Sequence, residues 1–332
     1  WPLSTRETPK QFIKLLGDTS LLQQSYSHLA GILAPDRILV LTNRDYVPLV
    51  REQLPALPPE NVIGEPMRRD TAAAVCLGAL LAKKRHGNPV IVTVTADHLI
   101  EPAETFQREL MSAARMARET GALYTLGIRP TYPATAYGYL ELGGGIATGD
   151  GCEHFQVQRF REKPDPETAR EFTASGRYLW NSGMFVWTAD AILEELRRFL
   201  PDHVQRLSEA VDRESDDALH AAFEPLERIS IDYAVMEKAA DVRCVAGTFA
   251  WKDLGGWLAI HDYLAADAHG NVSNRRLFTR EARNNLVFAE DPAETVVLLG
   301  VNDLVIVRSG ARTLVAAKDH LEDLKRIVED IE

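Results

Sequence analysis

Short apolar runs alternate with longer amphipathic stretches through the first two-thirds of the chain. Residues 38–42 and 90–95 are short runs of apolar and β-branched residues, which is the pattern of strands buried on both faces of a sheet. Residues 71–86 are rich in alanine and leucine, residues 105–119 are amphipathic, and a glycine closes each of these predicted helices. This alternation predicts an α/β fold with a doubly wound, mostly parallel, Rossmann-like sheet.

The same pattern predicts the other elements of this region. The expected strands are residues 38–42, 61–63, 90–95, 123–128, 137–142 and 155–162. The expected helices are residues 20–33, 46–54, 71–86, 105–119, 166–175, 189–200, 203–211 and 231–240. We expect Asp70 to cap the helix at 71–86 and the glycines at 143–145 to form a hairpin between two strands.

The chain opens on a loop instead of a strand. A doubly wound sheet normally begins with a central strand and a glycine-rich turn that leads to a phosphate site. Here the residues from Trp1 onward read as a loop, and a helix is expected at 20–33. Without a central strand its two neighbours would be exposed, so we expect a strand and a glycine-rich turn upstream of Trp1.

The spacing of the predicted elements changes after residue 268. Strands are expected at 285–288, 295–299, 304–307 and 313–316, followed by a helix at 320–331. Short strands at a spacing of roughly ten residues are typical of a small β domain. We therefore divide the chain into a large α/β domain, 1–268, and a small β-rich domain, 269–332.

Composition and charge exclude several classes of protein. The 332 residues are 45% apolar and 26% charged, as in an ordinary globular protein, and the formal net charge is -11. A nucleic-acid binder would usually carry a basic surface, so we expect no nucleic-acid partner. No apolar run approaches the ~18 residues of a membrane-spanning helix, so we expect no membrane association.

Cysteine usage favours a reducing compartment. Cys76, Cys152 and Cys244 are far apart, odd in number and form no CxxC pair, so neither a zinc site nor a disulfide framework is expected. We expect the protein to be cytoplasmic.

Two aspartates and one lysine are candidates for phosphate chemistry. Asp97 follows the predicted strand at 90–95, where the ligands of open α/β sheets bind, and a carboxylate there suits Mg²⁺. Asp253 precedes two glycines that permit a tight backbone near a ligand. Lys10 follows a proline at the edge of a loop, where it could contact phosphates. Alternatively, Asp97 is a helix cap or a partner in a loop salt bridge, and Asp253 is an N-cap.

A second group of residues suits sugar-phosphate recognition. Glu162 could accept hydrogen bonds from sugar hydroxyls, and the adjacent Lys163 could hold a phosphate as a point charge. Asn181 brings an amide, and the backbone N–H of Gly138 could reach a ligand. Taken alone, Glu162 and Lys163 are better explained as an exposed ion pair before a helix. A turn explains the segment of Asn181 equally well, and Gly138 could simply begin a hairpin.

A third group lies between a predicted strand and a helix N-terminus. Helix N-termini attract anions. Glu65 and Asp70 could accept hydrogen bonds from guanine N1 and N2, with Thr71 beside them. Capping by Asp70 is the simpler explanation.

Taken together, these segments resemble the mannose-1-phosphate guanylyltransferases (GDP-mannose pyrophosphorylases) of the sugar nucleotidylyltransferase superfamily. The matching stretches are residues 1–12, 64–74, 96–98, 137–139, 160–164, 180–185, 230–238 and 253–257. They follow one another in order along most of the chain. The sequence departs from the family at its opening, because the family's glycine-rich loop with its arginine would lie just before Trp1.

The resemblance implies that the protein is an enzyme, a GTP-dependent nucleotidyltransferase, that joins GTP and mannose 1-phosphate to give GDP-mannose and pyrophosphate. A phosphate oxygen of the sugar phosphate attacks the α-phosphorus of GTP in line, with Mg²⁺ as cofactor. The resemblance further implies a C-terminal domain similar to a left-handed β-helix, and a homodimer.

The resemblance also assigns roles to the candidate residues. It implies that Lys10 contacts the GTP phosphates and that Asp97 and Asp253 hold Mg²⁺. Lys163 is expected to hold the sugar phosphate. Mannose hydroxyls are expected to contact Glu162, Asn181 and the backbone of Gly138, and the guanine is expected near Glu65, Asp70 and Thr71.

Two other functions stay open at this point. One is a sibling nucleotidylyltransferase that uses another base or another sugar 1-phosphate. The other is a protein without catalytic activity that binds GDP-mannose and regulates a partner, although a pure binder has no need of paired metal carboxylates.

Overall fold

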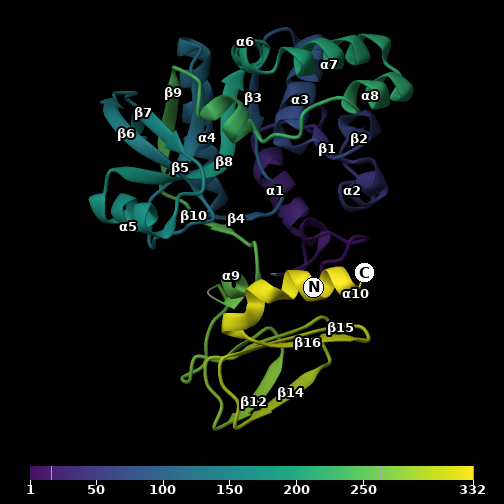
Figure 1. The fold of residues 1–332 in the computed structure, drawn as a ribbon, viewed down its shortest axis with the longest axis vertical. Coiled ribbons are helices and arrows are strands. Elements are labelled where there is room, and N and C mark those ends of the chain that lie inside the picture. Colours follow the sequence, from purple (N-terminus) through teal and green to yellow (C-terminus); the bar gives the residue numbers. More distant parts are fainter. Residues whose placement is uncertain (16, 262, 332) are drawn as a thin grey trace. The chain divides into compact units, whose positions relative to one another are not determined.

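The computed structural model describes residues 1–15, 17–261 and 263–331. The chain divides into two compact units (Figure 1). The first, here named the terminal unit, consists of Trp1–Gln24, Asp97–Leu99 and Lys252–Glu332. The second, named the central unit, consists of Ser25–Ala96 and Ile100–Trp251. Both ends of the chain therefore belong to one unit together with a short internal segment.

A six-stranded sheet forms the middle of the central unit, in the order β3-β8-β5-β9-β7-β6. Its strands are β3 (Val90–Thr93), β5 (Leu123–Ile128), β6 (Gly138–Ile146), β7 (His154–Arg161), β8 (Tyr178–Thr188) and β9 (Val242–Gly247). The α/β class, with parallel strands and a β-helix-like C-terminal part, is confirmed. The six-stranded sheet itself is mixed and not mostly parallel as expected.

The mixed character has a simple cause. In this sheet β5 and β9 pair in parallel, whereas β8 is antiparallel to β3, β5 and β6. β6 and β7 follow one another as a hairpin, and a hairpin can pair only in the antiparallel sense. β8 returns between β3 and β5 in the opposite direction and pairs antiparallel with both and with β6, and β7 also pairs antiparallel with β9.

Two smaller sheets complete the strands of the first 253 residues. β1 (Val40–Asn43) and β2 (Val62–Glu65) pair in parallel, with Val40 opposite Val62. β4 (His98–Glu101) and β10 (Ala250–Asp253) form another pair. Among the described strands, β1 pairs only with β2 and β3 only with β8, and all residues of β1 and β3 are half-buried.

Helices pack on the strands and on one another. They are α1 (Leu21–Ala30), α2 (Val47–Gln53), α3 (Asp70–His86), α4 (Ala103–Thr120), α5 (Pro166–Ser175), α6 (Ala189–Phe199), α7 (Pro201–Arg213) and α8 (Asp216–Phe223). Short 3-10 turns form at η1 (Lys10–Phe12), η2 (Pro35–Arg37), η3 (Arg44–Tyr46) and η4 (Pro59–Asn61). α4 contacts β3, β5, β8 and β9, while α3, α6 and α7 contact one another. Leu77, Trp187 and Leu193 lie in the buried core that joins this helical layer to the sheet.

Three expectations about local structure are wrong. Asp70 does not cap α3: it is the helix's first residue, has a φ of 65°, and pairs with Arg228. The glycines at 143–145 lie inside β6 and not in the hairpin connection. The helix expected at 231–240 is a single π-helical turn, η5 (Asp232–Met236), because the N–H of Glu237 donates to the carbonyl of Asp232, five residues back.

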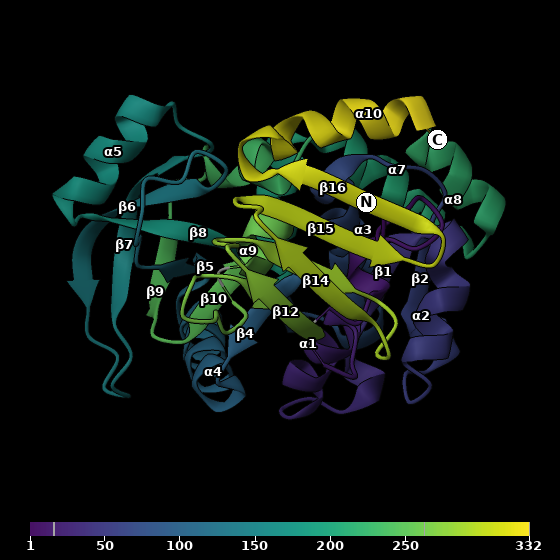
Figure 2. The same cartoon turned by 90° about the horizontal axis from the view of Figure 1, so that it is seen from below.

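Short strands form most of the terminal unit. They are β11 (Val272–Ser273), β12 (Arg276–Arg280), β13 (Leu286–Ala289), β14 (Thr295–Leu299), β15 (Leu304–Ser309) and β16 (Arg312–Ala317). β11, β13 and β15 pair in parallel. β16 pairs antiparallel to β15, and β12 pairs in parallel with β14 (Figure 2). α9 (Trp257–His261), η6 (Lys318–Asp323) and α10 (Leu324–Ile331) are the helical elements after β10.

A ladder of polar side chains runs through the turns of these coils. The fully buried Asn285 donates from Nδ2 to Asn271 Oδ1 at 2.8 Å and accepts from the N–H of Leu304 at 3.0 Å. Asn271 in turn donates from Nδ2 to Asp267 at 3.0 Å. Each turn therefore satisfies the backbone of the next turn, which keeps buried polar groups paired.

The start of the chain packs on the hydrophobic core of these strands. Leu15 and Leu21 are buried together with Leu286, Phe288 and Val305. The loop that carries Lys10 is therefore supported by residues that follow it by more than 250 positions. Among the described residues no helix is both long enough and apolar enough to cross a membrane.

Candidate active site

Lys10, Asp97 and Asp253 meet in the terminal unit. Lys10 Nζ lies 2.9 Å from Asp97 Oδ2 and 3.5 Å from Asp253 Oδ1. About a third of each side chain is exposed, at 32% for the lysine and 31% for each aspartate. Both carboxylates share one ammonium group, and for Asp97 this contact is the loop salt bridge named above as the alternative to a metal site.

Three different elements bring these side chains together. Lys10 begins the turn η1, which is anchored by the buried Phe12. Asp97 follows β3 directly before β4, and Asp253 is the last residue of β10. Because the three residues belong to separate elements, only the tertiary structure can make them neighbours.

The charges of this cluster influence one another. Burial lowers the pKa of Lys10, but Asp97 and Asp253 outweigh that effect, so that its pKa lies above the ordinary value and the ammonium stays charged. His98 Nε2 lies 3.8 Å from Asp97 Oδ1. Burial lowers the pKa of His98 despite the two carboxylates, which favours a neutral imidazole.

The donor set of the cluster fits Mg²⁺. Asp97 and Asp253 are hard oxygen donors, and both already approach a single cationic atom, Lys10 Nζ. The described residues contain no group of three or more side chains that could hold a metal. The remaining ligands would have to be substrate phosphate oxygens and water, which is the usual arrangement for Mg²⁺ in phosphate-handling enzymes.

In the central unit, Gly138, Glu162 and Asn181 converge. Gly138 lies opposite Asn181 in the pairing of β6 with β8. A Cβ added to Gly138 would overlap Glu162 Oε2 and lie 3.3 Å from Asn181 Cβ, so a larger residue would displace the glutamate. The absence of a side chain at Gly138 therefore leaves room for the carboxyl group of Glu162 itself.

The Glu162 carboxyl group is held in an unusual state. Its Oε1 is 3.4 Å from Lys163 Nζ, while its Oε2 is buried and has no hydrogen-bond partner among the described residues. Burial, assisted by the charge of Asp232, raises the pKa of Glu162 to about 7. Lys163 itself is 58% exposed and has a φ of 44°. A buried acceptor with no partner, beside an exposed cation, suits a polar ligand that carries an anionic group.

Two further residues belong to this group and were not assigned to it from the sequence. Asp232 Oδ1 accepts from Asn181 Nδ2 at 3.0 Å, and Glu237 Oε1 accepts from the N–H of Glu162 at 3.0 Å. Both lie in the stretch 230–238 that resembles the family, and this resemblance was the only feature of the sequence that pointed to them. That stretch gave no indication of which residues its carboxylates contact.

The residues expected near guanine are less closely connected. Burial raises the pKa of Glu65, at the end of β2, to about 7. Asp70 Oδ2 is 3.7 Å from Arg228 Nε, and Thr71 Oγ1 accepts from the N–H of Ile231 at 2.8 Å. Asp70 and Thr71 thus face the segment after α8, and in the described residues neither forms a hydrogen bond or an ion pair with Glu65.

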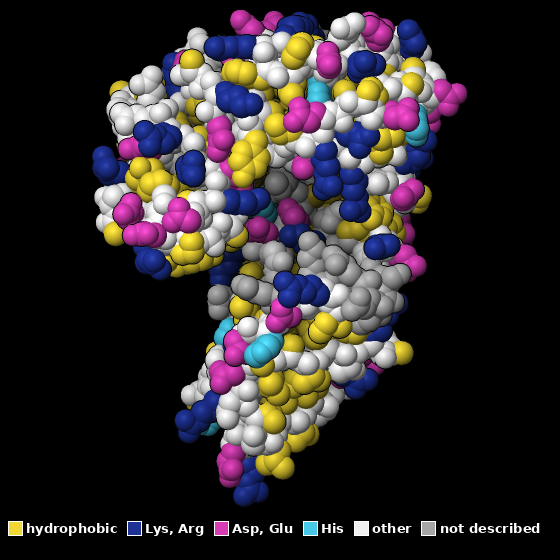
Figure 3. Space-filling view, in the orientation of Figure 1, with side chains coloured by type: hydrophobic (Ala, Val, Ile, Leu, Met, Phe, Trp, Pro, Cys, Tyr) yellow, Lys and Arg dark blue, Asp and Glu magenta, His cyan; other side chains and the backbone are white. Residues whose placement is uncertain are grey.

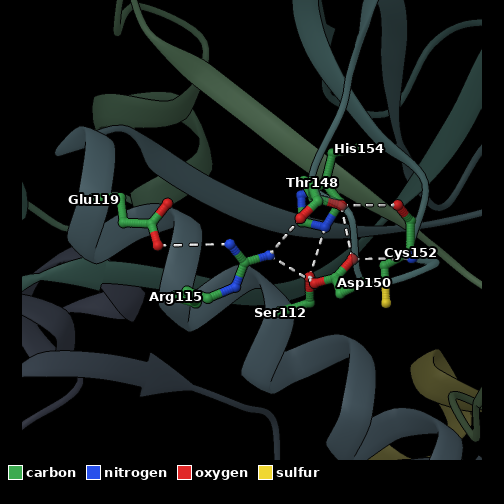
Figure 4. A network of polar contacts seen from close by, with 7 residues as sticks. All are labelled: Ser112, Arg115, Glu119, Thr148, Asp150, Cys152 and His154. Carbon is green, nitrogen blue, oxygen red and sulfur yellow. Dashed lines mark hydrogen bonds and ion pairs between the residues drawn. The ribbon is translucent and has the colours of Figure 1, made fainter.

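A serine, an aspartate and a histidine also meet in the central unit (Figure 4). Ser112 Oγ contacts both Asp150 Oδ2 and His154 Nε2, the latter at 2.8 Å, and Arg115 Nη2 is 2.8 Å from Asp150. In a hydrolytic triad the carboxylate orients the histidine. Here it contacts the serine, and His154 Nδ1 is buried without a partner in the described residues. The network therefore fastens the β6–β7 connection to α4.

Comparison with known proteins places this geometry in a family. The model described as "Nucleotidyl transferase" matches residues 1–270, and the model described as "MannoseP isomerase/GMP-like beta-helix domain" matches residues 278–331. The chain belongs to the nucleotidyl transferase family. The family resemblance inferred from the sequence motifs, and with it the class of nucleotidyltransferase enzyme, is confirmed.

Individual members of the family are similar over the whole chain. The mannose-1-phosphate guanylyltransferase of Escherichia coli (strain K12) is 37% identical over 340 residues, which are 100% of this chain and 70% of that protein. The alginate biosynthesis protein AlgA of Pseudomonas aeruginosa is 37% identical and is covered to 69%. A crystal structure described as mannose-1-phosphate geranyltransferase from Thermus thermophilus is 34% identical, with a TM-score of 0.90, and covers 100% of this chain and 95% of its own.

Proposed function

We propose that this protein transfers GMP from GTP to mannose 1-phosphate and releases pyrophosphate, giving GDP-mannose. The observation that carries the proposal is the pair of carboxylates, Asp97 and Asp253, on Lys10 Nζ. The choice of guanine and mannose is supported by the full-length similarity to relatives named mannose-1-phosphate guanylyltransferase.

The reaction itself needs positioning more than covalent chemistry. A phosphate oxygen of mannose 1-phosphate, already anionic, forms a bond to the α-phosphorus of GTP. The bond from that phosphorus to the bridging oxygen breaks, and pyrophosphate leaves with the electron pair. No proton has to be removed from the nucleophile, so the protein mainly has to align the two phosphates and neutralise charge.

The terminal unit is proposed to supply the charge. Lys10, which stays protonated beside its two carboxylates, contacts the GTP phosphates and stabilises the negative charge that develops in the transition state. Enzymes of the nucleotidyl transferase family generally use a divalent metal. Asp97 and Asp253 would hold Mg²⁺, which when bound neutralises phosphate charge and orients the substrate.

The central unit is proposed to bind the sugar phosphate and the base. Lys163 holds the phosphate of mannose 1-phosphate as a point charge. The free Oε2 of Glu162, the amide of Asn181 and the backbone of Gly138 contact sugar hydroxyls. Glu65, Asp70 and Thr71 are the proposed guanine-proximal residues, supported by the position of Asp70 and Thr71 at the N-terminus of α3.

Product formation by the full-length protein tests this proposal. Incubation with each nucleoside triphosphate and each of several sugar 1-phosphates should release pyrophosphate fastest with GTP and mannose 1-phosphate. Faster release with UTP or dTTP would favour a sibling nucleotidylyltransferase. Tight GDP-mannose binding without turnover of any pair would favour a regulator without catalytic activity.

We also propose that the protein forms a homodimer through the outer face of β12 and β14. Phe278, Val297 and Leu299 are 48%, 69% and 68% exposed on these two strands. Hydrophobic side chains gather over this part of the terminal unit in Figure 3. Large exposed apolar patches mark interaction sites, and a second copy of the chain would cover this one.

A further inference from the structure

The π-helical turn η5 contacts both groups proposed to bind the sugar. Asp232, its first residue, accepts from Asn181 Nδ2 at 3.0 Å. Glu237, which follows its last residue, accepts from the N–H of Glu162 at 3.0 Å. π-helical turns are rare and often occur at functional sites. This turn places the carboxylate of Asp232 on the side chain of Asn181 and the carboxylate of Glu237 on the backbone of Glu162, the two residues proposed to bind the sugar.

The amide of Asn181 has one possible orientation in this environment. Its Oδ1 lies 3.3 Å from the N–H of Gly183, a group that can only donate, and 2.9 Å from Thr125 Oγ1. Its Nδ2 must therefore face Asp232, which as a carboxylate can only accept. An amide nitrogen carries two hydrogens, and Asp232 takes one. In the described residues no second acceptor for Asn181 Nδ2 is present, so one N–H remains for a ligand.

The carboxylate of Asp232 is half-buried. Burial raises its pKa, while hydrogen bonds, including the one from Asn181, act in the opposite direction. Removing a carboxylate from water costs free energy unless the group is hydrogen-bonded, and the Asn181 amide supplies one such bond. Asn181 and Glu162 together would then offer a ligand one fixed N–H donor and one free carboxyl oxygen, a combination that suits two neighbouring hydroxyl groups of a hexose.

We propose that Asp232 is a positioning residue that fixes the Asn181 amide and thereby sets the selection of the sugar. This inference rests on the proposed function, because it concerns the mannose 1-phosphate subsite. Asp232 acts through Asn181 and does not itself contact the substrate. Without the carboxylate of Asp232 the Asn181 amide can rotate, so its N–H donor would no longer be held in one orientation toward the sugar hydroxyls.

Kinetics of three variants test the proposal in the full-length protein. Asp232→Ala should raise KM for mannose 1-phosphate by about 10- to 100-fold, the range expected for a lost charge-assisted hydrogen bond, and leave KM for GTP within about two-fold. It should also reduce the preference for mannose 1-phosphate over its C2 epimer, glucose 1-phosphate. Asp232→Asn, which can still accept from Asn181, should restore part of the loss. Asp212→Asn, an exposed aspartate on α7, is the matched control and should change nothing.

A double-mutant cycle separates positioning from a general structural role. In an Asn181→Ala background, Asp232→Ala should change KM for the sugar phosphate by less than about three-fold, because the group that it orients is already gone. If Asp232→Ala fails to fold, Thr125→Val replaces it, since this variant removes the donor on the other side of the same amide.

The outcomes are distinct. If the wild-type protein makes no GDP-mannose, both the proposed function and this inference are wrong. An active wild type, in which Asp232→Ala leaves the sugar KM unchanged or has the same effect with and without Asn181, overturns this inference alone. Equal increases in KM for GTP and for the sugar phosphate would likewise show that Asp232 has only a structural role.

Discussion

At the scale of single residues, the cluster of Lys10, Asp97 and Asp253 combines two requirements of phosphoryl chemistry. The lysine supplies fixed positive charge, and the two carboxylates supply oxygen donors for a divalent cation. In the structure the single ammonium group offsets only part of the charge of the two carboxylates. A triphosphate and a metal ion would have to take over these contacts, so we expect removal of either carboxylate to affect turnover more than binding.

Asp97→Asn and Asp253→Asn should therefore each lower kcat by at least ~100-fold, with smaller changes in substrate binding, because an amide is a much poorer magnesium ligand. Steady-state kinetics at varied Mg²⁺ and isothermal titration with GTP would measure the two effects. Asp18→Asn, at an exposed aspartate of the same unit, is the control. Normal turnover in either variant would remove that residue from the metal site.

Lys163 is expected to act on one substrate. Its ammonium is exposed and lies 3.4 Å from Glu162, so it is available to an anionic ligand. Lys163→Ala should raise KM for mannose 1-phosphate by about 10-fold or more and leave KM for GTP nearly constant. Lys83→Ala, which removes another exposed lysine of the central unit, is the control. A change confined to GTP would assign Lys163 to the nucleotide instead.

Glu162 should make stability depend on pH. Its pKa is raised from 4.5 to about 7, so the folded state keeps a proton that the unfolded chain has lost. Stability that depends on this proton is present below pH 4.5 and is lost as the pH rises to about 7. Glu162→Gln should therefore be more stable relative to wild type at pH 8 than at pH 5, by up to about 3 kcal/mol.

Thermal unfolding of the ligand-free protein at the two pH values measures this difference. Glu171→Gln, at an exposed glutamate of α5, should show no such dependence. A melting-temperature difference between Glu162→Gln and wild type that is the same at pH 5 and pH 8 would mean that the carboxyl group titrates normally.

At the scale of elements, the β-helix-like strands support the loop that carries Lys10. Leu15 and Leu21 share a buried core with Leu286 and Phe288, and Trp257 Nε1 donates to the carbonyl of Trp1 at 3.0 Å. The C-terminal strands therefore share a core with the residues on both sides of the chain segment that follows η1, namely Ile13, Leu15 and Leu21.

Leu286→Ala tests this support against Leu207→Ala, which makes an equivalent change in the core of the central unit. Both leucines are fully buried, and each substitution should cost about 2–5 kcal/mol. Only Leu286→Ala should accelerate hydrogen exchange at the amides of Phe12 and Ile13, which donate within η1. Equal exchange in the two variants would mean that the loop is stable without the C-terminal core.

At the scale of the whole molecule, association is proposed to cover the outer face of β12 and β14. In the parallel pairing Phe278 lies opposite Val297, and Arg280 lies opposite Leu299. Replacing Val297 and Leu299 with lysine places two charges in this face, so the double variant should be monomeric where the wild type is dimeric. Sedimentation equilibrium measures the oligomeric state of the wild type and of the double variant. Thr313→Lys, at an exposed residue of β16, is the control. A wild type that is monomeric at micromolar concentration, or a double variant that stays dimeric, would contradict the proposed interface.

Much of the chain could be predicted from local patterns. The strands at 123–128 and 295–299 and the helix at 166–175 have the predicted bounds. Short, largely apolar runs mark the strands, and a proline at its start and a glycine at its end mark the helix, so these signals act within a few residues. The helix α8 was missed, although Ser215 caps it by accepting from the N–H of Ala218. Family motifs were likewise visible in the sequence, because they are short.

The relations between these segments were decided only by tertiary structure. Lys10 and Asp253 are 243 residues apart and share a contact because the first turn and the last two residues of β10 belong to one unit. Asn181 and Asp232 are 51 residues apart. The π-helical turn, which the sequence predicted as part of a longer helix, places the carboxylate of Asp232 within hydrogen-bond distance of the Asn181 amide. Local preferences depend on neighbours along the chain, whereas strand order and core packing determine which side chains meet. The sequence could therefore name the reacting groups, and the fold decided which of them act together.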